Sequence, residues 1–406
     1  MHFKKAIIGF LCFVFLTVIT ATPVCAAEPP KIQGQAAVLI DTHNLQVLYG
    51  KNMHQRMYPA STTKILTGII ALEKGNLNDM VSVSWEAVNT EGTHIGLQEG
   101  EQLSLEDLLY ALLLNSANDS AEAIAEHIGN SIKGFTDIMN DKAREIGAVN
   151  SHFNNPHGLP DDNHYTTAYD LALIAQYAMQ NEKFREIIKV RNTTITRGDP
   201  DAQYHISNHN KLLDRYNEAT GIKTGYTNAA GQCLVSSAKR GERELIAVVL
   251  KSEGTNIWTD SESLLRYGFD NFQRVHLIGQ GQIMTWAKVE NGEQAGVSLV
   301  TADNFSWNVP RGHHSAIRNE VVKNESIEAP VKKGQKLGEL VFSDGQKELG
   351  RVDLVANKDV KRKVSGQWWF WPVIFISGLF LLRFWIRYRR RRKLYRRRKF
   401  SPWKSF

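Results

Sequence analysis

The chain of 406 residues is 42% hydrophobic and 22% charged, with a formal net charge of +7. This length and apolar content indicate a globular protein of two or three domains and exclude a disordered polyelectrolyte. The positive charge lies at the ends: residues 383–406 hold twelve Lys and Arg and no acidic residue, and without these, Lys4 and Lys5, 35 basic residues remain against 42 acidic ones. The body is therefore acidic, and a surface for nucleic acid spread over it is excluded.

The first 26 residues are typical of a secretory signal peptide. Lys4 and Lys5 form its charged start, residues 6–19 are an apolar run, and Val24-Cys25-Ala26 resembles a small-residue cleavage site. We therefore expect residues 1–26 to direct export and to be removed. An uncleaved anchor is the alternative, although the run is short for a membrane span of about 20 residues. Lipid attachment at Cys25 is disfavoured by the preceding Val24.

The cysteines exclude a disulfide framework. Cys12 and Cys25 fall within the signal peptide, so the exported chain retains Cys233 alone. One cysteine allows no intramolecular disulfide. Because Cys233 lies in an apolar, strand-like stretch, we expect it to be a packed core residue rather than a nucleophile.

Residues 35–272 combine strand and helix patterns. Segments 36–40 and 45–49 predict a hairpin of buried strands. A helical apolar pattern begins near Ser61 and ends at Gly75, and two further helices are expected on either side of Ser116. Strands that enclose a block of helices predict an α/β domain with an antiparallel sheet. The helices on either side of Ser116 are expected at 104–114 and 119–128. The other expected elements are helices at 135–146, 168–179 and 258–272 and strands at 232–239 and 244–251.

The chain changes character after this domain. Short alternating segments with turn signals at Asn291-Gly292 and Asp344-Gly345 predict a separate, small all-β domain over residues 275–355.

A membrane anchor is expected near the C-terminus. Residues 368–386 are apolar apart from Arg383 and begin with Trp368, Trp369 and Trp371. This predicts a transmembrane helix with an aromatic belt, and the basic residues of 387–406 predict that its end is cytoplasmic. We expect a single-pass protein of the cell membrane with its main domain outside. A helix lying on the membrane surface is the alternative, but no polar face recurs at helical spacing before Arg383.

Three short motifs share an informative order and context. They are Ser61-Thr62-Thr63-Lys64, Ser116-Ala117-Asn118 and Lys223-Thr224-Gly225. Singly each is weak, because Ser-x-x-Lys recurs at 236–239 and 401–404 and Ser-x-Asn at 306–308. In the chosen set the first serine starts a helix, the second lies in a helix break 55 residues later, and the lysine begins a strand-like segment 107 residues beyond that.

The first two motifs suit nucleophilic catalysis. Lys64, three residues after Ser61 on a helical turn, lies on the same face, and with a lowered pKa it can remove the seryl proton. The helix N-terminus adds positive partial charge, and an amide there can donate to an oxyanion. Ser116 can pass the proton to the leaving amine, and Asn118 can hold Lys64 or the substrate backbone.

The third motif suits recognition of a chain end. Lys223 and Thr224 supply a charge and a hydroxyl for a terminal carboxylate, while Gly225 lets an extended substrate lie close to the strand. The amide of Tyr226 is the second expected oxyanion donor. Taken singly, a strand lysine is usually solvated and a serine at a helix start is usually a cap, so the ordered trio carries the interpretation.

With these motifs the sequence resembles the low-molecular-mass D-alanyl-D-alanine carboxypeptidases, a branch of the penicillin-binding proteins, over residues 36–355. The resemblance implies an α/β fold of the DD-peptidase/β-lactamase type followed by a β-rich domain. It also implies removal of the terminal D-alanine from the peptidoglycan pentapeptide, inhibition by β-lactam antibiotics, and no metal or other cofactor. Relatives associated with sporulation are similar as well. The stretches that carry the resemblance are YPASTTK at 58–64, NSANDSA at 115–121, NPHGL at 155–159 and GIKTGYT at 221–227.

Two features depart from the pattern of that family. Its members commonly end in an amphipathic helix on the membrane surface, whereas residues 368–386 are expected to span the membrane. The family's arginine in the loop after the last catalytic strand has no counterpart, because no Arg lies between Arg243 and Arg266. Lys223 and Thr224 are then expected to bind the carboxylate alone or with help from Lys251.

Other functions share these motifs. A class A β-lactamase adds a glutamate in a Glu-x-x-Leu-Asn context that activates the deacylating water, and no such stretch lies between the second and third motifs. A transpeptidase would use an amine in place of water, which the sequence leaves open. A non-catalytic wall-binding protein is disfavoured because Ser61, Lys64, Ser116 and Lys223 are all present.

Overall fold

The computed structural model describes residues 28–197, 199–312, 317–324, 326–364 and 367–398. The expected signal peptide and the last eight residues of the basic tail lie outside these ranges. The chain divides into two units. The first runs to Gln273 and includes 309–313, and the second comprises 274–308 and the chain from 314 onward.

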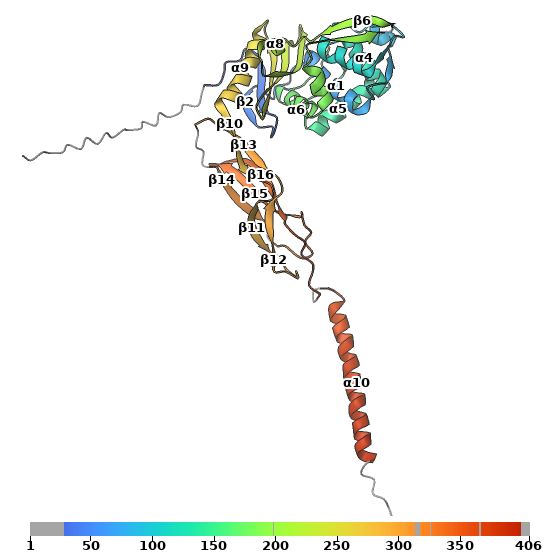
Figure 1. Ribbon diagram of the computed structural model, residues 1–406, viewed down its shortest axis with the longest axis vertical. Coiled ribbons are helices and arrows are strands. Elements are labelled where there is room, and N and C mark those ends of the chain that lie inside the picture. The colour runs from blue at the N-terminus through green and yellow to red at the C-terminus, as the bar shows by residue number, and fades with distance from the viewer. Residues whose placement is uncertain (1–27, 198, 313–316, 325, 365–366, 399–406) are drawn as a thin grey trace, which may run out of the picture. The chain divides into compact units, whose positions relative to one another are not determined.

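A five-stranded antiparallel sheet organises the first unit (Figure 1). Its order is β2-β1-β9-β8-β7, so the first strand of the unit pairs with the last, with Val38 opposite Val248. Both faces of β1 are buried, because Ile40 packs into one apolar cluster and Leu39 into another. A strand covered on both faces is expected to be a continuous apolar run. The bounds are β1 Ala36–Asp41, β2 Val47–Lys51, β7 Ala219–Thr227, β8 Gly231–Arg240 and β9 Arg243–Ser252.

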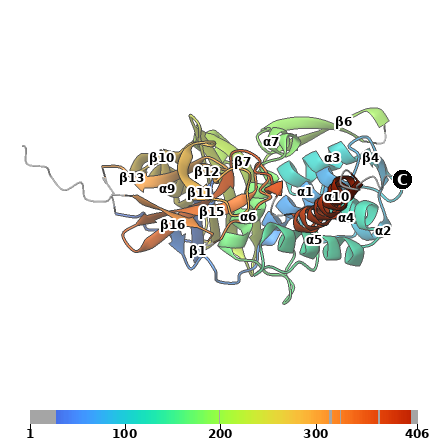
Figure 2. The same cartoon turned by 90° about the horizontal axis from the view of Figure 1, so that it is seen from below.

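Helices cover the two faces of this sheet (Figure 2). On one face lies α9, Asn256–Asn271, where Gly268 permits close packing because a Cβ there would lie 2.7 Å from a methyl group of Leu39. On the other face a block of helices surrounds α1, Lys64–Lys74, which is buried along its first eight residues. A helix that is apolar on all sides belongs in an interior.

The remaining elements of the first unit are short helices and two small two-stranded sheets. The helices are η1 Ala60–Thr63, α2 Trp85–Val88, α3 Leu105–Tyr110, η2 Ala111–Asn115, α4 Asn118–Gly129, α5 Ile132–Ile146, α6 Ala168–Ala178, α7 Glu182–Ile188 and α8 Leu212–Arg215. One of the two small sheets pairs β3 Met80–Ser82 with β4 Gln102–Ser104 across a longer connection, and the other is a hairpin of β5 Asn192–Arg197 and β6 Asp199–Ser207.

The expected α/β class with an antiparallel sheet is confirmed, with differences in detail that include the following two. Lys223 does not begin its strand, because β7 starts four residues earlier at Ala219. The β5–β6 hairpin was not expected, since Ile195 is the one buried residue of β5 and the strand shows no apolar alternation.

The second unit contains the expected β-rich domain. Its five-stranded sheet has the order β11-β12-β16-β15-β14, and residues such as Leu299, Leu340 and Leu354 form the core. The predicted turn at Asp344-Gly345 is a tight hairpin turn in which Gly345 has φ of 60°, whereas Asn291, with φ of 56°, lies in a longer connection between β11 and β12. The bounds are β10 Phe272–Ile278, β11 Ile283–Lys288, β12 Gly296–Thr301, β13 Phe305–Pro310, β14 Arg318–Lys323, β15 Lys336–Asp344 and β16 Lys347–Ala356.

Hydrogen-bonded structure extends past the expected end of this domain at residue 355. Val360, which is 1% exposed, pairs with Val331, and Lys363 N donates to Asn291 O. These contacts involve backbone groups of a polar segment, so no apolar pattern in the sequence indicates them.

Helix α10, Phe370–Arg398, ends the described chain. Its segment Phe370–Lys393 is long and apolar enough to cross a membrane, by length and composition. The helix starts two residues after the expected span of 368–386 and continues into the basic tail. Its length and composition suit a membrane anchor.

Candidate active site

The three motifs meet at one cavity of 240 Å³ in the first unit. Ser61 comes from η1, and Ser116 from the turn between η2 and α4. Thr224, Gly225 and Tyr226 come from β7. The other residues that line the cavity are Thr93, His209, Gln232, Cys233, Ile257 and Trp258. Lys64, Asn118 and Lys223 are buried, at 0%, 4% and 1% exposure. Lys64 is hydrogen-bonded to Ser61, Asn118 is hydrogen-bonded to Thr93, and Lys223 directly precedes Thr224 in β7.

Ser61 lies in a tight turn ahead of a helix rather than in the helix itself. The turn η1 is a 3-10 helix, and α1 begins at Lys64. Ala60, directly before Ser61, has φ of 47°, a left-handed conformation that is unfavourable for alanine. The surrounding packing must therefore enforce this conformation, which is common for residues next to a reactive group.

Two glycines let other segments pack against this turn. A Cβ at Gly158 would lie 1.8 Å from Ala60 O, and Gly158 has φ of 93°, so both sterics and backbone conformation require glycine. A Cβ at Gly225 would lie 2.9 Å from Ser61 N. The close approach expected at Gly225 is therefore present, but it is to the turn that carries Ser61.

The amine of Lys64 has three oxygen neighbours. Its Nζ lies 3.0 Å from Ser61 Oγ, 2.6 Å from Asn118 Oδ1 and 2.9 Å from His157 O. Burial, and then repulsion from Lys223, holds the pKa of this amine well below its usual value. In its neutral form the amine donates its two hydrogens to the two carbonyl oxygens and turns its lone pair toward the Ser61 hydroxyl. The arrangement is that of a base placed to take the seryl proton.

Asn118 is held by hydrogen bonds on every side. Its Oδ1 accepts from Lys64, its Nδ2 donates to Glu91 O at 2.5 Å, and its backbone N donates to Thr93 O at 2.6 Å. Gly92, between the two acceptors, has φ of 91° and would crowd Asn118 Nδ2 if it had a Cβ. Of the two roles expected for Asn118, the contact present in the structure is the one to Lys64.

Ser116 faces the cavity from an irregular backbone. The turn η2 is a π-helix, and Ser116 ends it with φ of 66°. Both features are uncommon and occur often at functional sites. The hydroxyl lines the same cavity as Ser61, where it can relay a proton.

Lys223 is buried in the middle of β7. Its Nζ donates to Thr224 O at 3.1 Å. Burial lowers the pKa of Lys223 to about 7, so near neutral pH its charge is poised to respond to a ligand. An anion close to this amine would favour its charged form.

The segment 155–159, to which sequence reasoning assigned no role, completes the surroundings of the base. His157 supplies the carbonyl oxygen that accepts from Lys64, and Glu122 Oε2 lies 3.4 Å from His157 Nε2. Burial lowers the pKa of His157. A backbone carbonyl acts independently of residue type, so the one local signal in the sequence is Gly158, which the tight packing requires.

The expected aid to carboxylate binding is not where the sequence suggested it. Lys251 lines a different cavity, and none of the described residues that line the Ser61 cavity is an arginine. His209 does line it, and burial followed by repulsion from Lys223 lowers the pKa of this imidazole. A neutral histidine can donate one N–H to a carboxylate.

Cys233 lines the cavity as a packed residue, as expected. It is 1% exposed, and burial raises the pKa of its thiol to about 11. The protonated thiol is a poor nucleophile. Within the described ranges, no group of three or more His, Cys, Asp and Glu side chains is placed to hold a metal ion.

Comparison with known proteins agrees with this geometry. Residues 23–254 match the family described as D-alanyl-D-alanine carboxypeptidase, and residues 272–362 match the C-terminal domain of penicillin-binding protein 5. The chain is 34% identical over 339 residues to D-alanyl-D-alanine carboxypeptidase DacF of Bacillus subtilis, covering 81% of this chain and 86% of the relative. It is 31% identical over 369 residues to D-alanyl-D-alanine carboxypeptidase DacA of Haemophilus influenzae, covering 87% and 92%. The solved structure of penicillin binding protein 5 from Haemophilus influenzae has a TM-score of 0.74 at 29% identity, covering 82% of this chain and 99% of that one.

Replacement of Lys64 by Ala is expected to slow acylation of Ser61 by a fluorescent penicillin by roughly 10²–10⁴-fold, the usual contribution of a general base. Lys74→Ala is the matched control, because Lys74 is exposed at the far end of the same helix. Gel fluorescence after timed mixing gives both rates, and thermal unfolding checks that each variant is folded. If Lys64→Ala unfolds, Lys64→Met keeps the buried stem and gives the same test. Acylation at the wild-type rate in a folded Lys64 variant would exclude this base.

Proposed function

The chain belongs to the D-alanyl-D-alanine carboxypeptidase family of serine peptidases, and from this membership we propose how its residues remove the terminal D-alanine from a peptidoglycan pentapeptide. The observation that carries the proposal is the buried Lys64 amine, which two carbonyl oxygens hold 3.0 Å from the Ser61 hydroxyl. A lysine that is both neutral and oriented in this way is the base that a serine nucleophile needs.

Acylation begins when Lys64 takes the proton of Ser61. Ser61 Oγ attacks the carbonyl carbon between the two D-alanines, and the backbone amides of Ser61 and Tyr226 donate to the oxygen that becomes negative. The tetrahedral intermediate then releases D-alanine, whose amine receives the proton from Lys64 through Ser116. The products of this half-reaction are free D-alanine and an ester between Ser61 and the shortened peptide.

Deacylation uses water in the space that D-alanine leaves. Lys64 accepts a proton from the water, directly or through Ser116, as the water oxygen attacks the ester carbonyl, and Lys64 then returns a proton to Ser61 Oγ as the peptide departs. A β-lactam acylates the same oxygen, but its leaving amine stays tethered to the adduct. None of the described residues that line the cavity is Asp or Glu, and we propose that water therefore attacks the penicilloyl ester slowly. This favours a slowly released β-lactam inhibitor over β-lactamase activity.

The terminal carboxylate of the substrate is the proposed ligand of Lys223 and Thr224. Lys223 offers an ammonium group that an anion stabilises, and Thr224 offers a hydroxyl at the cavity surface. His209, which also lines the cavity, is proposed as an additional N–H donor to this carboxylate. Gly225 contributes by letting β7 lie against the turn of Ser61.

Replacement of Lys223 by Ala is expected to lower kcat/KM for a peptide with a free C-terminal carboxylate roughly 10–100-fold more than for its C-terminal amide, the range of one hydrogen bond to a charged group. In the wild type, kcat/KM for the free carboxylate should fall as pH rises through about 7, because Lys223 loses its charge there. For the C-terminal amide, kcat/KM should show no such fall as pH rises through about 7. D-alanine release measured across pH gives both results, and equal losses on the two substrates would show that Lys223 does not bind the carboxylate.

Membrane attachment follows from the two ends of the chain. Residues 1–26 are proposed to direct export, and α10 to cross the cell membrane once, with its basic end in the cytoplasm. The catalytic and β-rich domains would then both lie outside, on the side where peptidoglycan is found.

An epitope placed after Phe406 is expected to resist protease added to intact spheroplasts, while the catalytic domain is digested or released. The membrane should shield a cytoplasmic tail until detergent opens it. Immunoblotting for the epitope and for the catalytic domain, with and without detergent, reports both sides. Digestion of the epitope in intact spheroplasts would refute the single-pass topology.

A further inference from the structure

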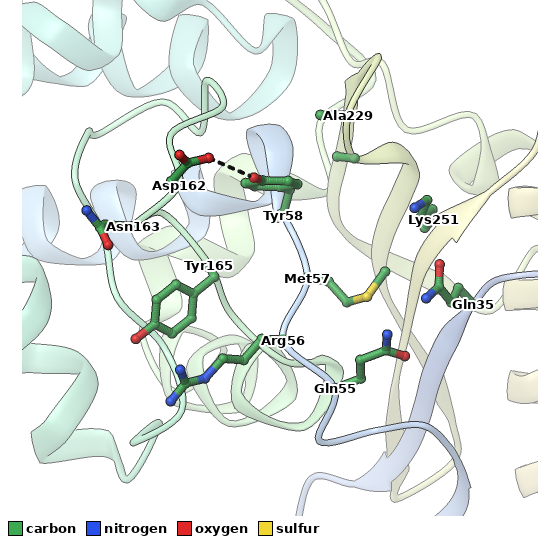
Figure 3. Close-up of a pocket in the computed structure, with 11 residues that line it drawn as sticks. Gln35, Gln55, Arg56, Met57, Tyr58, Asp162, Asn163, Tyr165, Ala229 and Lys251 are labelled. Atoms are coloured by element: carbon green, nitrogen blue, oxygen red, sulfur yellow. Dashed lines mark hydrogen bonds between the residues drawn. The ribbon is translucent and has the colours of Figure 1, made fainter.

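A second cavity, of 610 Å³, lies in the first unit (Figure 3). Cys233 belongs to the wall between the two, because it lines the Ser61 cavity and its Sγ lies 3.9 Å from Tyr58 O and 3.7 Å from Ala230 O. Tyr58 and Ala230 both line the second cavity. The linings of the two cavities are therefore in contact through Cys233.

We propose that the second cavity binds the part of the stem peptide that precedes the two D-alanines, with Lys251 recognising a carboxylate and Asp162 an ammonium group of that part. This inference rests on the proposed function, which sets the direction of the substrate. With the terminal carboxylate at Lys223 and the reacting carbonyl at Tyr226, the peptide runs along β7 toward Thr227. The turn 228–230 follows, and Ala229 and Ala230 line the second cavity.

Opposite charges face this cavity from different sides (Figure 3). Asp162 lies beside Tyr58, whose hydroxyl donates to Asp162 Oδ1 at 3.4 Å, while Lys251 lies next to Gln35 across the cavity. The guanidinium of Arg56 stacks over the ring of Tyr165, 4.5 Å from its centroid. The lining thus offers a carboxylate at Asp162 and cations at Lys251 and Arg56, and charges of both signs favour a ligand that carries both signs.

The position of Lys251 is built into the sheet. The pairing of β8 with β9 shifts between Gln232 and Leu234, where β9 has one extra residue. Lys251 lies in this bulge with φ of 53°, a conformation uncommon for lysine. Gly231 leaves room for its stem, since a Cβ there would lie 3.2 Å from Lys251 Cγ. Bulges beside active sites redirect side chains, and this one turns Lys251 into the cavity.

The test compares kcat/KM values that a single enzyme variant gives on a set of matched peptides. The parent is acetyl-γ-D-glutamyl-L-lysyl-D-alanyl-D-alanine, which has a free carboxylate and a free amine upstream of the D-alanines. One analogue has that carboxylate converted to an amide, and a second has the lysine amine acetylated. We expect the wild type to cleave the parent with a kcat/KM about fivefold higher than either analogue, the size of one partly exposed ion pair.

Each substitution should remove one preference. In Lys251→Gln the parent and the amide analogue should be cleaved equally well, while the preference for the free amine remains. In Asp162→Asn the reverse is expected. Lys239→Gln removes an exposed lysine of β8 outside both cavities and should keep both preferences. Because each preference is a ratio measured on one variant, partial loss of folded enzyme cancels.

The outcomes separate this inference from the proposed function. Wild-type enzyme that releases no D-alanine from diacetyl-L-lysyl-D-alanyl-D-alanine would refute the proposed function. If that short peptide is cleaved and the wild type shows neither preference, or Lys251→Gln and Asp162→Asn leave the ratios unchanged, the inference is overturned and the function stands. If adding a sugar to the peptide raises kcat/KM while Lys251→Gln leaves the two preferences unchanged, the cavity binds a different ligand and the inference is likewise overturned.

Discussion

Burial of the Lys64 amine is the condition on which the arrangement around Ser61 depends. An ammonium group is unstable away from water, so the neutral amine is favoured, and its two hydrogens then need acceptors. Asn118 Oδ1 and His157 O provide them at 2.6 and 2.9 Å. Its lone pair is left for the Ser61 hydroxyl. Asn118 and His157 lie 54 and 93 residues after Lys64 along the chain, so distant segments converge on one nitrogen atom.

The scaffold holds these segments against one another by close backbone packing. α1 is buried on all sides, and the strained turn at Ala60 is held against Gly158 and Gly225, neither of which has room for a side chain. The strand that carries Gly225 also carries Lys223, a second buried amine. Burial and repulsion from Lys223 lower the pKa of Lys64 and favour the neutral amine that the proposed base requires, while a pKa of about 7 leaves Lys223 able to carry charge for the proposed anionic substrate.

Residue types with a specific chemistry made much of this site predictable from sequence. Ser61 and Lys64 have few chemical roles at that spacing, and buried strands and helices follow from apolar periodicity. Features that arise from the backbone or from pairing gave no such signal. Any residue at position 157 would supply the same backbone carbonyl. The left-handed backbone conformation of Ser116 depends on the π-helix η2 that precedes it. Lys251 points into its cavity because β9 bulges against β8, which local sequence does not encode.

The most direct test of this account is to capture the covalent intermediate. The enzyme is mixed with a peptide that ends in D-alanyl-D-alanine, quenched in acid within milliseconds, digested, and analysed by mass spectrometry. We predict the peptidyl group, less one D-alanine, on the fragment that contains Ser61, with free D-alanine released in equal amount and no adduct in Ser61→Ala. An adduct on Ser116 instead, or D-alanine release by Ser61→Ala at the wild-type rate, would contradict the account.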